Sequence, residues 1–274
     1  MKHIIKILTG VLLVFSISSC EYFELDDVEG LSTEEIVKGL KEALVIGTDS
    51  AVSSLAVTNG YYLGNALNVK IPLPEEAEQV RSIINQYNSL SSIINLDSYF
   101  EDVVKSVNRA AESAAKDAAP IFVDAITSLS ITDATSILNG NNPYASSLDY
   151  DSTAATQYFK VETSSALTSL YAPKINEALG EDLGLGFSAV DAWELLTTQY
   201  NKLRSSFAVT LALAALSDVN LPEDINDDLG EFCTGKALDG LFYMVGNEEK
   251  EIRRDPFQWV SDIIQKVFGS LFEE

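Results

Sequence analysis

The chain has 274 residues, and its 41 Asp and Glu residues outnumber its 18 Lys and Arg residues, which gives a formal net charge of −23. A surface with this charge repels nucleic acid and anionic lipid headgroups, so no nucleic-acid partner is expected. A chain of this length can bury one sizeable core or two small ones.

Residues 1–19 are typical of a secretory signal, because a basic start precedes an apolar run and then small residues. The segment Ile17-Ser18-Ser19-Cys20 resembles the lipobox of bacterial lipoproteins, in which the cysteine becomes the first mature residue and carries a diacylglycerol. An ordinary cleaved signal with an incidental cysteine is the alternative. We therefore expect Cys20 to be lipidated and to attach the protein to a membrane through its acyl chains.

Residues 20–30 form a short acidic tether in this interpretation. Glu21 is not the aspartate with which enteric bacteria retain lipoproteins in the inner membrane. The expected location is therefore the outer membrane of a Gram-negative cell envelope, with the protein facing the periplasm.

Loss of the signal would also remove His3, the single histidine of the chain. Cys233 would then be the only free thiol, so no intramolecular disulfide is expected. Zinc sites built from Cys and His, and Ser-His-Asp or Cys-His catalysis, are excluded for such a chain. No metal and no cofactor is expected.

A single all-α domain is predicted over residues 31–274. Ser32 and Glu35 form a capping box that starts a helix running to about residue 57. Gly39 and Gly47 lie on its apolar face and predict a close approach of another helix. The following segment contains Ile71-Pro72-Leu73-Pro74, which is too rigid for a helix and predicts an extended loop over residues 61–74.

Residues 97–129 predict the longest helix and the centre of the fold. Apolar residues recur there at helical spacing, first large ones and then a stripe of alanines that a neighbouring helix can approach closely. Pro120 interrupts the run and predicts a kinked or restarted helix, because proline removes a helical hydrogen bond.

The remaining segments also have helical patterns. We expect helices over residues 75–90, 132–138 with Thr132 as cap, 152–180 restarted at Pro173, 188–203 with Ser188 as cap, and near the C-terminus after an acidic loop at 221–231. Residues 207–216 are apolar on nearly every side but too few to cross a bilayer, which predicts a buried helix. The fold class is therefore all-α, a multi-helix bundle of roughly eight to ten helices around a long kinked central helix.

Several short motifs are distributed along the chain: Ile71-Pro72-Leu73-Pro74, Asn108-Arg109-Ala110-Ala111-Glu112, Ala155-Thr156-Gln157-Tyr158-Phe159, Ala237-Leu238-Asp239-Gly240-Leu241-Phe242, and Glu248-Glu249 followed by Ile252-Arg253 and Asp255-Pro256. In their order and spacing they resemble the bacterial family called domain of unknown function 4197. The similarity covers residues 31–269. It implies an exported helical protein and carries no catalytic role.

Four short motifs have more ordinary explanations. The phosphate-loop-like run Gly230 to Lys236 lacks a following Ser or Thr and a preceding strand, so a helix start near Thr234 is expected. The glycines at 184 and 186 lack the preceding strand that a dinucleotide fingerprint requires, and they fit a linker. Asp224, Asn226 and Asp228 have only part of a calcium-loop pattern, and Ser113 with Lys116 lacks the rest of its catalytic signature.

A cluster of polar residues on otherwise apolar helices is the best candidate site: Asn108, Arg109, Glu112, Lys236, Asp239, Glu249, Arg253 and Asp255. Surface ion pairs or a buried polar network are the structural explanations. We predict that residues 108–112 meet residues 239–255 in one buried network, in which Arg109→Ala would cost about 3 kcal/mol.

The sequence thus favours a lipid-anchored envelope protein that acts as a binding or scaffolding module. The alternative is a hydrolase that needs no histidine and uses paired carboxylates, which the many Asp and Glu residues permit without singling out a pair.

Overall fold

The computed structural model describes residues 30–63, 69–147, 149–216, 219–222, 224–225 and 228–272. The predicted signal, Cys20 and most of the tether lie outside these ranges. Within them the chain forms ten α-helices and short 3-10 turns and contains no strand, which confirms the all-α fold class.

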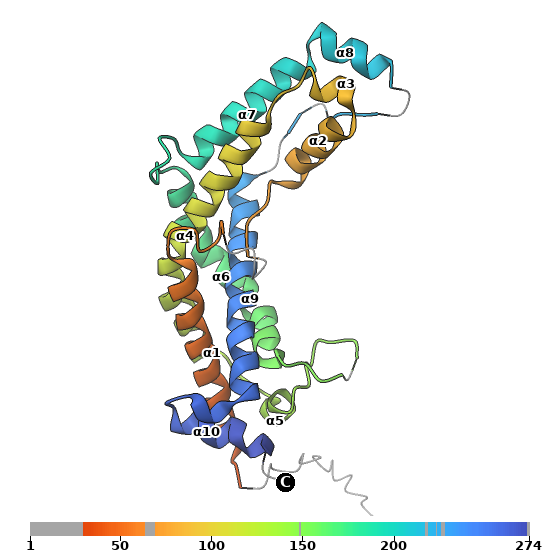
Figure 1. Ribbon diagram of the computed structural model, residues 1–274. Helices are drawn as coiled ribbons and strands as arrows, with labels where there is room; N and C mark the ends of the chain where they lie inside the picture. Colours follow the sequence, from red (N-terminus) through yellow and green to blue (C-terminus); the bar gives the residue numbers. More distant parts are fainter. Residues whose placement is uncertain are drawn as a thin grey trace, which may run out of the picture.

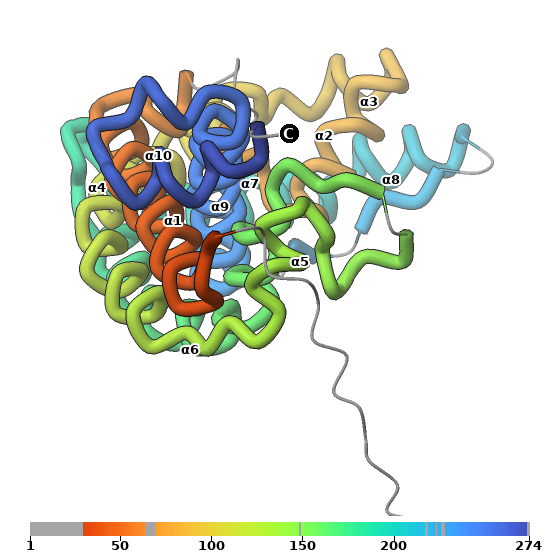
Figure 2. Tube along the Cα trace, turned by 90° about the horizontal axis from the view of Figure 1, so that it is seen from below, coloured from red at the N-terminus to blue at the C-terminus, as the bar shows by residue number. Residues whose placement is uncertain are grey.

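Four long helices form the bundle: α1 (Thr33–Leu55), α4 (Asp97–Ser128), α6 (Ala154–Leu179) and α9 (Leu229–Arg254). They run side by side along the molecule in Figure 1 and are seen end-on in Figure 2. Helix α4 packs against the other three and also against α7 (Ala189–Arg204). The predicted alanine stripe faces the core, because Ala110, Ala111, Ala114, Ala115 and Ala118 are all buried.

Both prolines inside long helices lie on exposed helix surface. Helix α4 continues through Pro120, and α6 continues through Pro173, so the predicted restart at Pro173 is wrong. In each case the residue four positions earlier, Lys116 or Ser169, is also exposed. Water can therefore bond the carbonyl that the proline leaves without a helical donor.

A short helix closes one end of the bundle. Helix α10 (Asp262–Gly269), flanked by the 3-10 turns η2 (Pro256–Gln258) and η3 (Ser270–Phe272), packs against the start of α1. A Cβ atom on Gly39 would lie 2.7 Å from the side chain of Val267, so glycine permits this contact. Lys266 also pairs with Glu35 in the first turn of α1.

The opposite end of the molecule carries smaller helices beside the upper part of α4 (Figure 1). They are α2 (Glu75–Gln86), α3 (Asn88–Ser91), α7 and α8 (Phe207–Ala214). The predicted helix over residues 75–90 is thus divided at Tyr87. Helix α5 (Ala134–Leu138) packs against α1 and α6 nearer the α10 end.

Local sequence signals placed several helix starts correctly. Ser32 and Glu35 form the predicted capping box, and Ser188 caps α7 with Asp191 as its reciprocal partner. The prediction for Thr132 is wrong, because α5 begins one residue later, at Ala134, after Asp133.

The prediction that residues 207–216 form a buried helix is wrong. Helix α8 forms there, but Phe207 is 81% exposed and Leu211 is 61% exposed, while Val209 alone among its residues is buried. The helix touches its neighbours along one side, at α3 and α7. Among the helices of the described ranges, none has the length and apolar content needed to cross a bilayer.

Candidate functional site

Asn108 on α4 is fully buried and holds the extended segment that contains Ile71. Its Oδ1 accepts a hydrogen bond from the Ile71 N–H at 2.9 Å, and its Nδ2 donates to the Ile71 carbonyl at 2.8 Å. Prolines at positions 72 and 74 cannot donate to a strand or helix ladder, so this segment needs a side chain as partner. Asn108 therefore fixes residues 69–72 against α4.

Glu112, one turn further along α4, organises the turn that follows α1. Its carboxylate accepts hydrogen bonds from the backbone N–H groups of Asn59, Tyr61 and Tyr62, at 3.0 to 3.2 Å. Arg109 donates to Glu112 at 2.6 Å and to the side chain of Asn59 at 3.0 Å. We call Asn59, Arg109 and Glu112 the turn cluster.

Tyr61 joins this turn to α9. Its hydroxyl donates to the Ala237 carbonyl at 2.8 Å, and its ring occupies the space beside Gly240, where a Cβ atom would lie 2.7 Å from the ring. Burial raises the pKa of Tyr61 well above its usual value, so the phenol stays neutral and can donate. The turn is thereby fastened to two helices of the bundle.

Glu249 and Arg253 form a second buried cluster, near the α10 end. Glu249 accepts from the backbone N–H groups of Ala155 and Thr156 and so caps the start of α6. Arg253 donates to Glu249 at 2.9 Å and to the carbonyls of Ile137 and Leu138 at the end of α5. The carboxylate thus lies at a helix N-terminus and the guanidinium at a helix C-terminus, where each charge is favoured. We call Glu249 and Arg253 the cap cluster.

The predicted single network between residues 108–112 and 239–255 is therefore wrong. Among the described residues, no hydrogen bond or ion pair joins Arg109 or Glu112 to α9; both find partners in the turn after α1. Asp239 instead pairs with Lys160 at 2.8 Å, and Asp255 lies at the end of α9. Seven of the eight candidate residues divide among the turn cluster, the cap cluster, the Ile71 anchor and a surface pocket, and Asp255 belongs to none of these groups.

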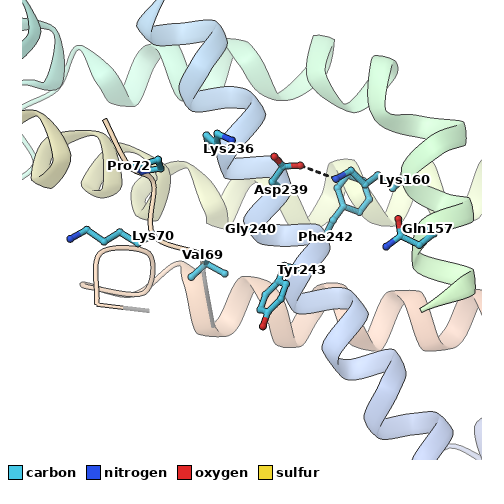
Figure 3. Close-up of a pocket in the computed structure, with 10 residues that line it drawn as sticks. All are labelled: Val69, Lys70, Pro72, Gln157, Lys160, Lys236, Asp239, Gly240, Phe242 and Tyr243. Carbon is cyan, nitrogen blue, oxygen red and sulfur yellow. Dashed lines mark hydrogen bonds and ion pairs between the residues drawn. The ribbon is translucent and has the colours of Figure 1, made fainter. Parts of the chain in front are cut away.

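That pocket lies over α9, between the extended segment and α6, and has a volume of about 480 Å³. Figure 3 shows Asp239, Phe242 and Tyr243 from α9, with the extended segment on one side and α6 on the other. Its charged lining residues are Lys70, Lys160, Lys236 and Asp239. We call it the lysine pocket.

Two buried polar residues of α4, Asn108 and Glu112, support the lysine pocket. Asn108 holds Ile71, whose neighbours Lys70 and Pro72 line the pocket. Tyr61, held by Glu112, packs against Gly240 in the pocket floor. These side chains thus have a structural part in shaping a site, and they do not themselves line it.

A second surface depression, of about 530 Å³, lies between α2 and the start of α4. Its lining includes the carboxylates of Glu78, Asp97 and Glu101. Glu78 pairs with Arg81 at 2.7 Å, and Glu101 accepts a hydrogen bond from the Tyr62 hydroxyl, which raises the pKa of Tyr62. Two of these three carboxylates are therefore already engaged by donors.

The structure shows where the short motifs of the sequence lie. Helix α9 begins at Leu229, five residues before the predicted start, so the phosphate-loop-like run lies within a helix. Asp228 caps that helix and Asn226 lies outside the described residues, and no group of metal-binding side chains occurs in the described ranges. Burial raises the pKa of the Cys233 thiol on α9, which makes it a poor nucleophile.

Sequence reasoning found Lys236 and Asp239 but missed Lys70, Lys160 and Tyr243 as members of the same pocket. A usable signal was present: Lys70 directly precedes Ile71-Pro72-Leu73-Pro74, and Lys160 directly follows Ala155-Thr156-Gln157-Tyr158-Phe159. Because the chain has few basic residues, those that lie directly beside a family motif are candidate site residues.

A family model described as "Protein of unknown function (DUF4197)" matches residues 30–269. No curated protein and no solved structure has significant similarity to the chain. The matched range contains the turn cluster, the cap cluster and all residues that line the lysine pocket. The chain therefore belongs to the DUF4197 family.

Proposed function

We propose that this protein is a lipid-anchored component of a bacterial cell envelope and that it acts as a binding module, with the lysine pocket as its binding site. The observation that carries the binding role is the way the pocket is built. Buried side chains of α4 hold two loop segments: residues 69–72, which form one wall of the pocket, and residues 59–62, which support Gly240 in its floor. Walls fixed in advance reduce the ordering that a ligand must bring about, which favours binding.

The anchor in this proposal is Cys20, and the support for it is the lipobox-like segment that ends there. The expected location is the outer membrane, facing the periplasm. Labelling of growing cells with a palmitate analogue tests this part: the wild-type protein becomes labelled and Cys20→Ala does not. A wild-type protein that is never labelled, or a Cys20→Ala variant that still is, would show that the anchor is absent.

Binding is favoured over hydrolysis by paired carboxylates for two reasons. The lysine pocket has one carboxylate in its lining, Asp239, whereas acid–base hydrolysis of this kind needs two. In the second depression Glu78 and Glu101 already have donor partners. A pocket of this volume also matches small-molecule sites, which supports ligand binding over a purely scaffolding role.

An obstruction experiment tests the binding role. Asp239 is exposed, so Asp239→Trp places a large ring in the pocket without disturbing the core. Soluble protein carrying Cys20→Ser is incubated with the small-molecule fraction of an envelope extract and examined by native mass spectrometry. We expect a retained compound that Asp239→Trp abolishes and that the remote Asp262→Trp keeps. No retained compound, or one that both variants retain, would contradict the binding role.

A further inference from the structure

The charge of the lysine pocket is opposite to that of the whole chain. Three of the 18 basic residues line it, with one carboxylate, although the chain has 41 acidic residues. We propose that the lysine pocket binds a small molecule through an oxyanion group, a phosphate or a carboxylate. This inference rests on the proposed function, because it names the chemical class of the ligand for that same pocket.

Lys236 is the cation most available to such a group. It is exposed, and it makes no hydrogen bond or ion pair with any residue in the described ranges. Lysine offers three donors on a flexible stem and suits an oxyanion as a point charge. An unpaired lysine is common on a protein surface, but here it shares a concave site with two others.

Lys160 has a partner that a ligand can replace. Its ammonium lies 2.8 Å from the Asp239 carboxylate, and both side chains remain substantially open to solvent. A dashed line marks this ion pair in Figure 3. An exposed ion pair of this kind contributes little, so a ligand oxyanion can compete for Lys160. Asp239 thus acts against an anionic ligand, both as a like charge and as a competitor for the lysine.

Lys70 completes the set from the opposite wall. In Figure 3 its side chain extends away from Asp239, and its Nζ lies 4.4 Å from the centre of the Tyr62 ring. Tyr62 belongs to the turn held by Glu112, so the resting position of Lys70 is itself set by the turn cluster. The long lysine stem lets the ammonium turn towards a bound anion.

The remaining walls and the charge of the chain define the ligand further. Tyr243 and Pro72 offer exposed apolar surface beside the lysines, which suits a small organic molecule that carries the oxyanion. Physiological salt largely screens the repulsion between a bound anion and acidic residues more than about 8 Å away. The attraction of lysines that contact the anion is not screened in this way. A long polyanion such as nucleic acid would still meet the acidic surface outside the pocket.

Calorimetric titration with inorganic phosphate and with succinate, at constant ionic strength, tests the proposal on the soluble full chain. Lys236→Gln and Lys160→Gln should each weaken binding roughly tenfold or more, as expected for loss of a charge-assisted hydrogen bond. Lys250→Gln removes the same charge from an exposed position on the same helix outside the pocket and should change affinity less than about twofold. Asp239→Asn should tighten binding, whereas the remote Asp262→Asn should not.

The two probes separate the sources of the oxyanion. Binding of phosphate alone assigns a phosphate-bearing ligand, binding of succinate alone assigns a carboxylate, and binding of both supports the shared chemistry. The proposal is overturned if neither anion binds, or if the pocket variants behave as Lys250→Gln and Asp262→Asn do. A neutral compound retained from the extract and blocked by Asp239→Trp, without anion binding, would overturn the ligand class and leave the binding role standing.

Discussion

Glu112 stabilises the fold mainly by accepting hydrogen bonds from backbone N–H groups, and less through its ion pair with Arg109. It is 4% exposed and accepts from three backbone N–H groups, which would otherwise be left without partners. We expect Glu112→Ala to cost about 3 kcal/mol of unfolding free energy, because the buried Tyr61 N–H and two partly buried N–H groups lose their acceptor. Lys116→Ala on the exposed side of the same helix should stay within about 0.5 kcal/mol of the wild type.

Urea unfolding measures these free energies for Glu112→Ala and Lys116→Ala, and the same series includes Arg109→Ala. The side chain of Arg109 is 21% exposed and borders the turn cluster, so solvent can replace part of its interactions. We expect a cost of about 1 kcal/mol, below the value that a single buried network would give. A loss for Glu112→Ala within error of Lys116→Ala would show that the turn does not depend on this carboxylate.

Glu35 contributes a pH-dependent part of the stability. The hydrogen bond from Lys266, and then those from Ser32, lower the pKa of Glu35 from 4.5 to about 2. The unfolded state binds the proton more tightly, so this stabilisation is present above pH 4.5 and is lost as the pH falls towards about 2. Thermal unfolding should show Glu35→Gln with a lower Tm than the wild type near neutral pH, and the difference should shrink as the pH falls from 4.5 towards about 2.

The neighbouring variant Glu34→Gln serves as the control, because Glu34 has no ion pair among the described residues and lies in the same first turn. Its Tm difference from the wild type should vary less with pH. If Glu35→Gln and Glu34→Gln give the same dependence, the Lys266 pair does not join α1 to α10.

At the scale of elements, alanine substitutions at two glycines in helix interiors distinguish the effect of helix propensity from the effect of packing. A Cβ atom on Gly47 would lie 3.1 Å from the Val245 side chain and 3.2 Å from its carbonyl, whereas a Cβ on Gly235 meets nothing within 4 Å. Gly235→Ala should stabilise by up to about 1 kcal/mol through helix propensity. Gly47→Ala should destabilise, because α1 and α9 must move apart. Equal effects of the two substitutions in urea unfolding would contradict the close α1–α9 contact.

Helix α8 offers a second contrast within one element. Phe207→Ser and Leu211→Ser should each change unfolding free energy by less than about 0.5 kcal/mol, because both side chains are exposed. Val209→Ala should cost about 2 kcal/mol, because Val209 is fully buried. A large loss of unfolding free energy for Phe207→Ser would contradict the exposed position of this side chain and support the prediction of a buried helix.

These elements differ in how much of their structure could be predicted from the sequence. Capping signals such as Ser32 with Glu35 are local, and they placed helix starts correctly. The exposure of α8 depends on whether another segment covers it, and its composition does not contain that information. The partners of Glu112 are backbone N–H groups, which no residue type marks, so the sequence suggested side chains on α9 instead. The lysine pocket unites three segments distant in sequence, and only their packing brings them together.

At the scale of the whole molecule, the described chain begins at the same end of the bundle as α10, and α8 lies at the other end (Figure 1). Under the proposed anchor at Cys20, the short tether would place the α10 end next to the bilayer, and the apolar residues Phe257 and Val260 are exposed at that end. A fluorophore on Val260→Cys in reconstituted lipoprotein should be quenched by quencher-labelled lipids more strongly than one on Phe207→Cys. Equal quenching at the two ends, or stronger quenching at Phe207→Cys, would contradict this orientation.

The central claim is that buried side chains of α4 hold the segment that walls the lysine pocket and the turn that supports its floor. Amide hydrogen exchange measured by NMR tests it most directly, because Tyr61, Tyr62 and Ile71 lie outside helices yet donate to Glu112 or Asn108. We predict that these three amides exchange as slowly as those in the middle of α4. In Glu112→Gln we predict faster exchange at Tyr61 and Tyr62, with Ile71 unchanged. Exchange of all three at the rate of a free peptide in the wild type would contradict the account.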